Sequence, residues 1–381
     1  YYIRPARSRK PFLEVAFIKS VFFLMLLVCS IPQILQAQEL LLKVAIVGDT
    51  GIGDRGYRPA FEAVRSAIAK SNSDMLLHLG DFVYQSELFP SSCNPKYLAQ
   101  ARKAFVEPFP YRLFVPGDND FPPRITEPMA SDCWSELETL DTPFDKPISG
   151  RSAQPGNFEG AKRIGPVLFV VLNSQNKKDP TSWLDPRIER AKHDGLWVVI
   201  AIHEPPLTSG WFIDKREGTL KWINKLKPDL VLSGNQHSYE RFHALGVPAV
   251  DQTLPVKKSN DAIYNKGDGS IYIVSGGGGA TLKPFADWRK IKELLAPIWV
   301  LDAIAFRSLT HHFVQLEISA NSIMGKTFQV CAEPSNNGSG PRWRPNNPWW
   351  KTIELPCENS EPGVLEIDRF EILRQKKSPL R

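Results

Sequence analysis

The sequence predicts an α/β fold, because short apolar segments alternate with segments whose apolar residues have helical spacing. Helices that connect parallel strands cover the faces of a sheet, so this alternation is typical of a layered α/β architecture. Several of the apolar segments also end directly at Gly-Asp, Asn or His. The chain has 381 residues, 42% apolar and 23% charged, a globular composition sufficient for one large domain with or without an extension.

The predicted elements follow one another along most of the chain. Residues 40–47 form an apolar run with little alternation, which is typical of a strand buried on both faces. Further strands are predicted at 75–79, 111–115, 167–172, 197–202, 230–232, 271–274, 313–318 and 364–373. Helices are predicted at 59–70, 96–106, 187–193 and 220–226. An irregular insertion is expected at 122–154, and a loop-rich segment at 328–356, which is rich in Trp, Pro and Asn.

The N-terminal segment, residues 1–37, has the order of a secretory signal peptide. Basic residues precede an apolar run at 21–35, and Gln36-Ala37-Gln38 follows it, with cleavage expected after Ala37. The apolar run is short for a membrane span, which needs about 20 residues. The protein is therefore expected to be exported (secreted, periplasmic or lumenal), and an uncleaved membrane anchor is the alternative.

The charge distribution argues against a nucleic-acid partner. The formal net charge is +6, but residues 1–37 carry five basic side chains and one acidic side chain. The remainder is therefore near +2, whereas nucleic-acid binding usually needs a basic stripe on the folded part. A membrane contact is expected only if the N-terminal segment stays attached.

Four cysteines remain after removal of the expected signal. An even number of cysteines in an exported chain suggests two disulfides. Sequence order favours Cys93–Cys133 and Cys331–Cys357, although three pairings are possible. A zinc site made of cysteines alone is the runner-up, and no Cys-x-x-Cys spacing supports it.

Polar side chains follow the ends of five predicted strands. Asp49, Asp81, Asp118 and His203 each come just after an apolar run, and His237 follows one within a short loop. Any one of them alone is ordinary, since Gly-Asp is a common turn pair. Ligand sites of α/β folds form at the carboxyl ends of strands, so five such residues together indicate a site. Carboxylates and imidazoles suit Zn, Fe or Mn, and Asp81 could bridge two cations that together bind a phosphoryl group.

The ordered set of motifs resembles the calcineurin-like metallophosphoesterases. The matching blocks are Gly48-Asp49-Thr50-Gly51, Gly80-Asp81-Phe82-Val83-Tyr84, Gly117-Asp118-Asn119-Asp120, His203 and Gly234-Asn235-Gln236-His237. Tyr84 and the Tyr-Glu-Arg after His237 resemble the purple acid phosphatase branch. The resemblance covers about residues 44–318. It implies a four-layer sandwich of two mixed β-sheets packed face to face and flanked by helices, with a catalytic domain at 40–320 and a loop-rich C-terminal extension at 321–381 that completes it.

The resemblance also implies two metal ions. The first would be held by Asp49, Asp81, Tyr84 and His237. It would be ferric iron, because a tyrosinate suits the hard Fe(III) cation. The second would be surrounded by Asp81, Asp118, His203 and Asn235, and would be Fe, Mn, Mg or Zn.

The sequence departs from the family pattern at three positions. Asp118 stands where the family usually has Asn, Asn119 where it has His, and Asn235 where it has the first His of the last block. An oxygen-rich second site favours Mn, Mg or Fe over Zn. Asn119 can donate a hydrogen bond but cannot transfer a proton near neutral pH. Asn119 and Asp120 are the candidate catalytic residues, and His243 is a further candidate for the missing proton donor.

The expected reaction is hydrolysis of a phosphate monoester by direct attack of a metal-bound hydroxide, as in an acid phosphatase. The expected partner is a small phosphorylated substrate. One alternative is a phosphodiesterase or nucleotidase that uses the same site. The other is a degenerate member that binds metal without catalysis, an idea motivated by Asn119 and Asn235.

Two further motifs have both structural and functional interpretations. Ser275 and the four glycines after it form either a tight turn or a substrate-facing loop. His311 and His312 precede an alternating strand, so one of them is expected to pack in the core rather than bind metal.

Overall fold

A computed structural model of the chain describes residues 41–53, 58–84, 94–120, 146–147, 159–174, 176, 178–210, 217–247, 254–283, 285, 298–331 and 363–375. They belong to one unit, Leu40–Arg381. The expected signal peptide, all of the expected insertion except 146–147, and residues 332–356 lie outside the described residues. Within the described parts, every helix is too short or too polar to cross a membrane.

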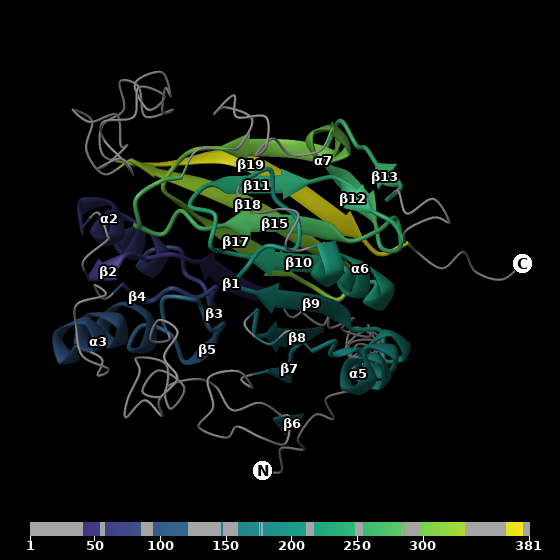
Figure 1. Cartoon of the computed structure of the whole chain (residues 1–381), viewed down its shortest axis with the longest axis horizontal. Helices are drawn as coiled ribbons and strands as arrows, with labels where there is room; N and C mark the ends of the chain where they lie inside the picture. Colours follow the sequence, from purple (N-terminus) through teal and green to yellow (C-terminus); the bar gives the residue numbers. More distant parts are fainter. Residues whose placement is uncertain are drawn as a thin grey trace, which may run out of the picture. The chain divides into compact units, whose positions relative to one another are not determined.

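The first sheet has seven strands in the order β14-β19-β18-β17-β1-β3-β5 (Figure 1). Its strands are β1 (Leu42–Val47), β3 (Met75–His78), β5 (Tyr111–Phe114), β14 (Ile263–Asn265), β17 (His312–Ile318), β18 (Ser322–Cys331) and β19 (Gly363–Leu373). β1, β3 and β5 are parallel, whereas β17 and β18 join them in antiparallel order. The three parallel strands therefore bring their carboxyl ends to one edge.

The second sheet has eight strands in the order β16-β11-β15-β10-β9-β8-β7-β6. They are β6 (Lys146–Pro147), β7 (Gly160–Ile164), β8 (Val167–Leu172), β9 (Trp197–Ile202), β10 (Leu230–Ser233), β11 (Tyr239–Phe242), β15 (Ile271–Ser275) and β16 (Ile304–Ser308). β8, β9, β10 and β15 are parallel, and β7, β11 and β16 are antiparallel to their neighbours. Two short ribbons complete the strands: β2 (Ile52–Gly53) with β4 (Val83–Tyr84), and β12 (Ala244–Leu245) with β13 (Val256–Lys257).

Strand β8 shows why the apolar runs form layers. Its alternate side chains Val167, Phe169 and Val171 join the core that is shared with the first sheet. The intervening Leu168, Val170 and Leu172 join a second core with helix residues such as Leu184 and Ile223. Successive side chains of a strand point to opposite faces, so a continuous apolar strand fits between a sheet and a helical layer.

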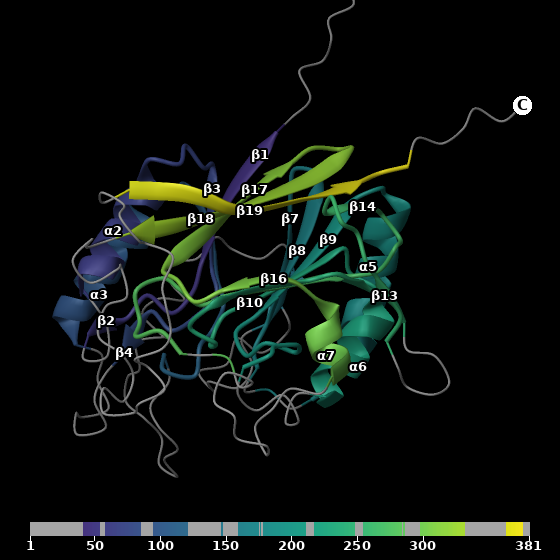
Figure 2. The same cartoon turned by 90° about the horizontal axis from the view of Figure 1, so that it is seen from above.

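The helices cover the outer faces of the two sheets (Figure 2). Helix α2 (Arg58–Ala69) packs on β17 and β18, whereas α5 (Thr181–His193) and α6 (Glu217–Leu226) pack together on the second sheet. The remaining helices are α3 (Pro95–Ala101), which continues as a π-helical turn (Arg102–Val106), and α7 (Ile298–Ala303). The predicted four-layer α/β sandwich is confirmed.

The structure differs from the sequence-based expectation at the C-terminal end. Residues 328–331, expected to begin a loop-rich segment, form the end of β18. Strand β18 was not predicted and lies between β17 and β19, whereas β19 confirms the strand predicted at 364–373 and lies between β18 and β14. Cys331 is disulfide-bonded, and its partner is outside the described residues, so the expected pairing with Cys357 stays a prediction.

Candidate metal centre

The polar residues predicted at strand ends come together where the two sheets meet. Asp49, Asp81 and Asp118 follow β1, β3 and β5 of the first sheet, and His203 follows β9 of the second. His237 lies in the loop between β10 and β11. The first sheet thus supplies carboxylates and the second supplies imidazoles.

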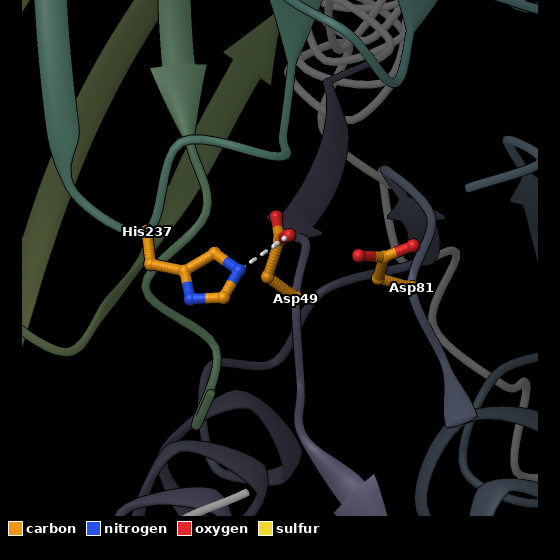
Figure 3. Close-up of side chains that lie close together, drawn as sticks. All are labelled: Asp49, Asp81 and His237. Atoms are coloured by element: carbon orange, nitrogen blue, oxygen red, sulfur yellow. Dashed lines mark ion pairs between the residues drawn. The ribbon is translucent and has the colours of Figure 1, made fainter. Parts of the chain in front are cut away.

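The first ligand group consists of Asp49, Asp81 and His237, whose ligand atoms all lie within 4.8 Å of one another. Figure 3 shows the imidazole of His237 turned toward the Asp49 carboxylate, at 3.2 Å between Nε2 and Oδ1, with the Asp81 carboxylate beside them. The hydroxyl of Tyr84 lies 3.3 Å from Asp49 Oδ1 and 3.4 Å from His237 Nε2. The structure therefore brings together all four residues predicted for the first metal.

The second ligand group consists of Asp81, Asp118 and His203. His203 Nε2 lies 3.0 Å from Asp118 Oδ1 and 3.3 Å from Asp81 Oδ1. Asp81 belongs to both groups, as expected for a carboxylate that bridges two cations. The Asp118 side chain is 44% exposed, whereas Asp81 and His203 are buried, so this group opens to solvent at Asp118.

Both histidines are oriented by backbone carbonyls. His203 Nδ1 lies 2.7 Å from the carbonyl oxygen of Leu79, and His237 Nδ1 lies 2.5 Å from that of Thr281. An Nδ1–H that donates to a carbonyl leaves Nε2 as the metal-binding nitrogen. In both residues it is Nε2 that faces the carboxylates.

The backbone of the loops is held in a conformation that non-glycine residues rarely adopt. Asp49, Asp81 and Asn235 have φ values of 58°, 57° and 61°. Such left-handed residues cluster at functional sites, where the surrounding structure stabilises them. The backbone N–H of Asn235 donates to Asp49 Oδ2 at 2.8 Å. The turns therefore orient the predicted ligands, and the side chain of Asn235 as a metal ligand stays a prediction.

The electrostatics of the centre favour a bound positive charge. Burial lowers the pKa of His203, but Asp81 and Asp118 outweigh it and raise that pKa well above its usual value. Burial raises the pKa of Asp81, but His203 and hydrogen bonds from Asn119 outweigh it and lower that pKa. Burial, Asp81 and Asp49 raise the pKa of Tyr84, so a phenolate there requires a strong cation nearby. Buried carboxylates need cationic partners, and the donor set fits metal ions.

Asn119 donates two hydrogen bonds to the carboxylate of Asp81, which both ligand groups share. Its backbone N–H donates to Asp81 Oδ1 at 2.9 Å, and its side-chain Nδ2 donates to Asp81 Oδ2 at 2.8 Å. The amide therefore orients Asp81. A role of Asn119 in binding the substrate stays a prediction.

Of the two candidate proton donors, Asp120 contacts the ligand loops, whereas His243 contacts Tyr264. Both oxygens of Asp120 accept backbone N–H bonds, from Asp81 at 2.9 Å, Gly117 at 2.9 Å and Phe82 at 2.7 Å. Burial, followed by the charge of Asp81, raises the pKa of Asp120 to about 7. Its carboxyl thus joins two ligand loops. His243 lies 2.9 Å from the hydroxyl of Tyr264. A role of either residue as proton donor stays a prediction.

The Tyr-Glu-Arg motif holds the loop after His203 and pairs with strand β19. Glu240 accepts hydrogen bonds from the Thr208 hydroxyl and from the backbone and hydroxyl of Ser209, so it holds the loop that follows His203. Arg241 forms a buried bidentate ion pair with Asp368 of β19. The contacts of Glu240 and Arg241 therefore join the motif to the surrounding fold.

Lys283 is a site residue that sequence reasoning missed. Its ammonium donates to the backbone oxygen of Asn235 at 2.9 Å, and its own backbone oxygen accepts a bond from Gln236 at 3.0 Å. Contacts to backbone atoms leave no motif in the sequence. His312 is structural, since its Nε2 pairs with the Ser275 hydroxyl at 3.0 Å. In the turn after β15, the N–H of Gly278 donates to the oxygen of Gly48 at 3.0 Å, and a substrate-facing role of this turn stays a prediction.

Comparisons with known proteins agree with this arrangement. The calcineurin-like phosphoesterase family matches residues 42–239, just over half of the chain. The chain therefore belongs to the calcineurin-like phosphoesterase family. The family's members are metal-dependent phosphoester hydrolases that typically bind two metal ions.

Two curated proteins are similar in sequence to this chain. An uncharacterized protein of Mycobacterium tuberculosis is 32% identical over 171 residues, which is 39% of this chain and 32% of the relative. A probable inactive purple acid phosphatase of Arabidopsis thaliana is 24% identical over 312 residues, which is 74% of this chain and 46% of that protein. This chain thus spans a third to a half of the curated relatives that it matches.

The solved structures show the fold. A purple acid phosphatase from yellow lupin (Lupinus luteus) seeds has a TM-score of 0.57 and 16% identity, with 88% of this chain and 54% of that chain covered. PhoD has a TM-score of 0.52 and 12% identity, with 87% and 70% covered. The fold is thus that of the metallophosphoesterases, and purple acid phosphatases are among its structural neighbours.

Proposed function

We propose that the chain is an exported dinuclear-metal phosphatase that hydrolyses phosphate monoesters, as acid phosphatases do. The observation that carries this proposal is the sharing of Asp81 between two three-residue ligand groups. A single carboxylate within reach of both groups is the arrangement that two-metal hydrolysis requires.

The two halves of the centre are proposed to hold different metals. The phenol of Tyr84 within 3.3 Å of Asp49 and 3.4 Å of His237 supports Fe(III) in the first half. Two carboxylates and one imidazole in the second half support Fe, Mn, Mg or Zn, with the amide of Asn235 as an additional ligand.

The residues of the chain prepare the chemistry in three ways. When bound, two such ions activate a water molecule and bind the phosphoryl oxygens. His203 and His237 present Nε2 because Leu79 and Thr281 hold their Nδ1 atoms. Asn119 and Asp120 hold the bridging carboxylate and its loop, and the exposed Asp118 marks the side from which a small phosphorylated substrate enters.

Export is supported by chemistry outside the centre. Cys331 is disulfide-bonded, and disulfides persist in oxidising compartments. The signal-like order of residues 1–37 points the same way.

The test measures metal content and hydrolysis on the same preparations. Natively purified protein is expected to contain two metal ions per chain and to hydrolyse an aryl phosphate. Asp81→Asn keeps the shape of the side chain but removes the bridging charge, so we expect metal content to halve or worse and activity to fall by about 10³-fold. A broad visible absorption band that is lost in Tyr84→Phe would establish iron–tyrosinate. Two metals with full activity in Asp81→Asn would refute the proposal.

A non-catalytic member is the second candidate, because Asn119 occupies the histidine position and its amide is engaged with Asp81. A relative named as probably inactive points the same way. This candidate predicts one tightly held metal at most and no turnover with Fe, Mn or Zn supplied. A faster reaction on an aryl diester than on a monoester would instead favour a phosphodiesterase.

A further inference from the structure

A cavity of about 860 Å³ lies at the opposite edge of the second sheet from the metal centre. Four basic residues and the amide of Asn224 contribute to its lining, and we call these five residues the basic pocket. They are Lys192, Lys227, Lys266, Arg374 and Asn224.

The strand directions separate this pocket from the metal centre. Asp229 and Ser270 of the pocket lining immediately precede β10 and β15, which run parallel. The loop that leads to His237 follows the other end of β10. At about 3.3 Å per residue, β10 and its flanking residues place the two sites roughly 20 Å apart.

Part of the positive charge is already used by the fold. Lys266 pairs with Asp229 at 2.6 Å, and that carboxylate oxygen also accepts the N–H of Val198 at 2.8 Å. Lys192 contacts Glu189 at 2.9 Å and the last carbonyl of α6 at 3.1 Å. The single acid in the lining is therefore satisfied, and the pocket keeps an excess of cations.

Other donors of the pocket have no acceptor among the described residues. Asn224 is 2% exposed, and the hydroxyl of Tyr272 donates to its Oδ1 at 2.9 Å, which turns Nδ2 away from Tyr272. Nδ2 has no partner, and neither do Nε and Nη2 of Arg374. The guanidinium of Arg374 lies over the ring of Trp197, with Cζ 4.8 Å from its centre. Buried N–H groups without acceptors are costly, so these three donors indicate a ligand that supplies oxygen atoms.

The lining also indicates the size and shape of that ligand. Pro228, Leu245 and Val247 give the cavity an apolar wall beside the basic residues. A cavity of this volume is within the range that binds small organic molecules. A guanidinium, ammonium groups and an amide donor together suit a dianionic oxyanion better than a monocarboxylate.

We propose that the basic pocket binds a small organic phosphate, with the phosphate group at Arg374 and Asn224 and the organic part against Leu245 and Val247. The site is separate from the metal centre and does not rest on the proposed phosphatase function.

The test titrates the full chain with phenylphosphonate, whose carbon–phosphorus bond is not an ester. In His203→Ala, which disrupts the metal centre, one binding event is expected to persist by calorimetry. In that background Arg374→Gln and Asn224→Asp are each expected to weaken binding at least tenfold. Asn224→Asp keeps the acceptor for Tyr272 but replaces the free donor with a negative charge.

Three controls make the outcome decisive. Lys70→Gln removes one charge from the exposed end of α2 and is expected to change affinity less than twofold. Methylphosphonate is expected to bind more weakly than phenylphosphonate, and benzoate more weakly still. Melting curves confirm that the variants are folded. Three outcomes would each overturn the proposal. Binding could be lost in the His203→Ala background, stay unchanged in both pocket variants, or be equally tight for benzoate.

Discussion

Gly117 shows how closely the ligand loops approach one another. A Cβ atom added there would overlap the backbone nitrogen and Oδ1 of Asp81 and come within 3.0 Å of Asp120 Oδ2. Gly117→Ala must therefore displace the shared carboxylate. Because a displacement of about 1 Å costs on the order of 10²-fold in rate, we expect at least that loss of aryl phosphatase activity, together with lower metal content.

The matched control for this substitution is Gly218→Ala in α6. A Cβ atom there meets nothing within 4 Å, so metal content should stay the same. An alanine in a helix is favoured by up to about 1 kcal/mol over glycine, so a small gain in stability is expected. Unchanged metal content in Gly117→Ala would show that the loops can separate without loss of the site.

The sequence predicts which residues meet, but not what each of them contacts. Asp49, Asp81 and His237 were predictable because each follows the carboxyl end of an apolar strand. The contacts of Asn119 and Asp120 were not, because their partners Asp81 and Phe82 lie 38 or 39 positions away in the sequence.

A buried ion pair joins strand β19 to strand β11 of the second sheet. Asp368 accepts bonds from Arg241 Nε at 2.7 Å and Nη2 at 2.8 Å, and from the hydroxyl of Tyr239 at 2.7 Å. The Arg241 and Asp368 side chains are 4% and 6% exposed. Asp368→Ala leaves a buried guanidinium without a counter-charge, so we expect a loss of about 3–5 kcal/mol of unfolding free energy in urea.

Glu366→Ala on the same strand is the control. Glu366 pairs with Arg369 at 2.7 Å, but these side chains are 33% and 55% exposed. Exposed ion pairs contribute about 0–1 kcal/mol, so its effect should be small. Equal losses in the two variants would contradict a specific role for the buried pair.

The sequence predicts apolar strands better than strands that carry charged residues. Continuous apolar runs such as β8 and β9 were predicted with their observed bounds. Strand β11, Tyr-Glu-Arg-Phe, was missed, because its charged residues are buried only through partners distant in sequence. Strand β18 was also missed. Its buried residues alternate with partly exposed ones, so it contains no continuous apolar run.

Two adjacent buried histidines, His311 and His312, predict that the stability of the fold decreases in acid. Burial lowers the pKa of His312 to about 4, and burial lowers that of His311 to about 3. Both are neutral in the folded state. Their contribution to stability is therefore fully present above the unfolded pKa of about 6.5 and is lost as the pH falls from there toward 4.

We expect the unfolding free energy to fall between pH 7 and pH 4.5, with about 2 kcal/mol from His312 alone. His312→Gln should make this fall shallower in urea titrations at the two pH values. His193→Gln changes a side chain that is 88% exposed and should leave the pH profile unchanged. A wild-type slope in His312→Gln would contradict the assignment.

Each ligand group draws on both sheets, since Asp49, Asp81 and Asp118 follow strands of one and His203 and His237 follow strands of the other. An ion that binds either group therefore acts as a crosslink between the layers. Its release and the separation of the sheets are linked events. An ion present at 100 times its dissociation constant adds about 2.7 kcal/mol to the stability of the folded chain. Metal supply would then set how long the folded chain survives.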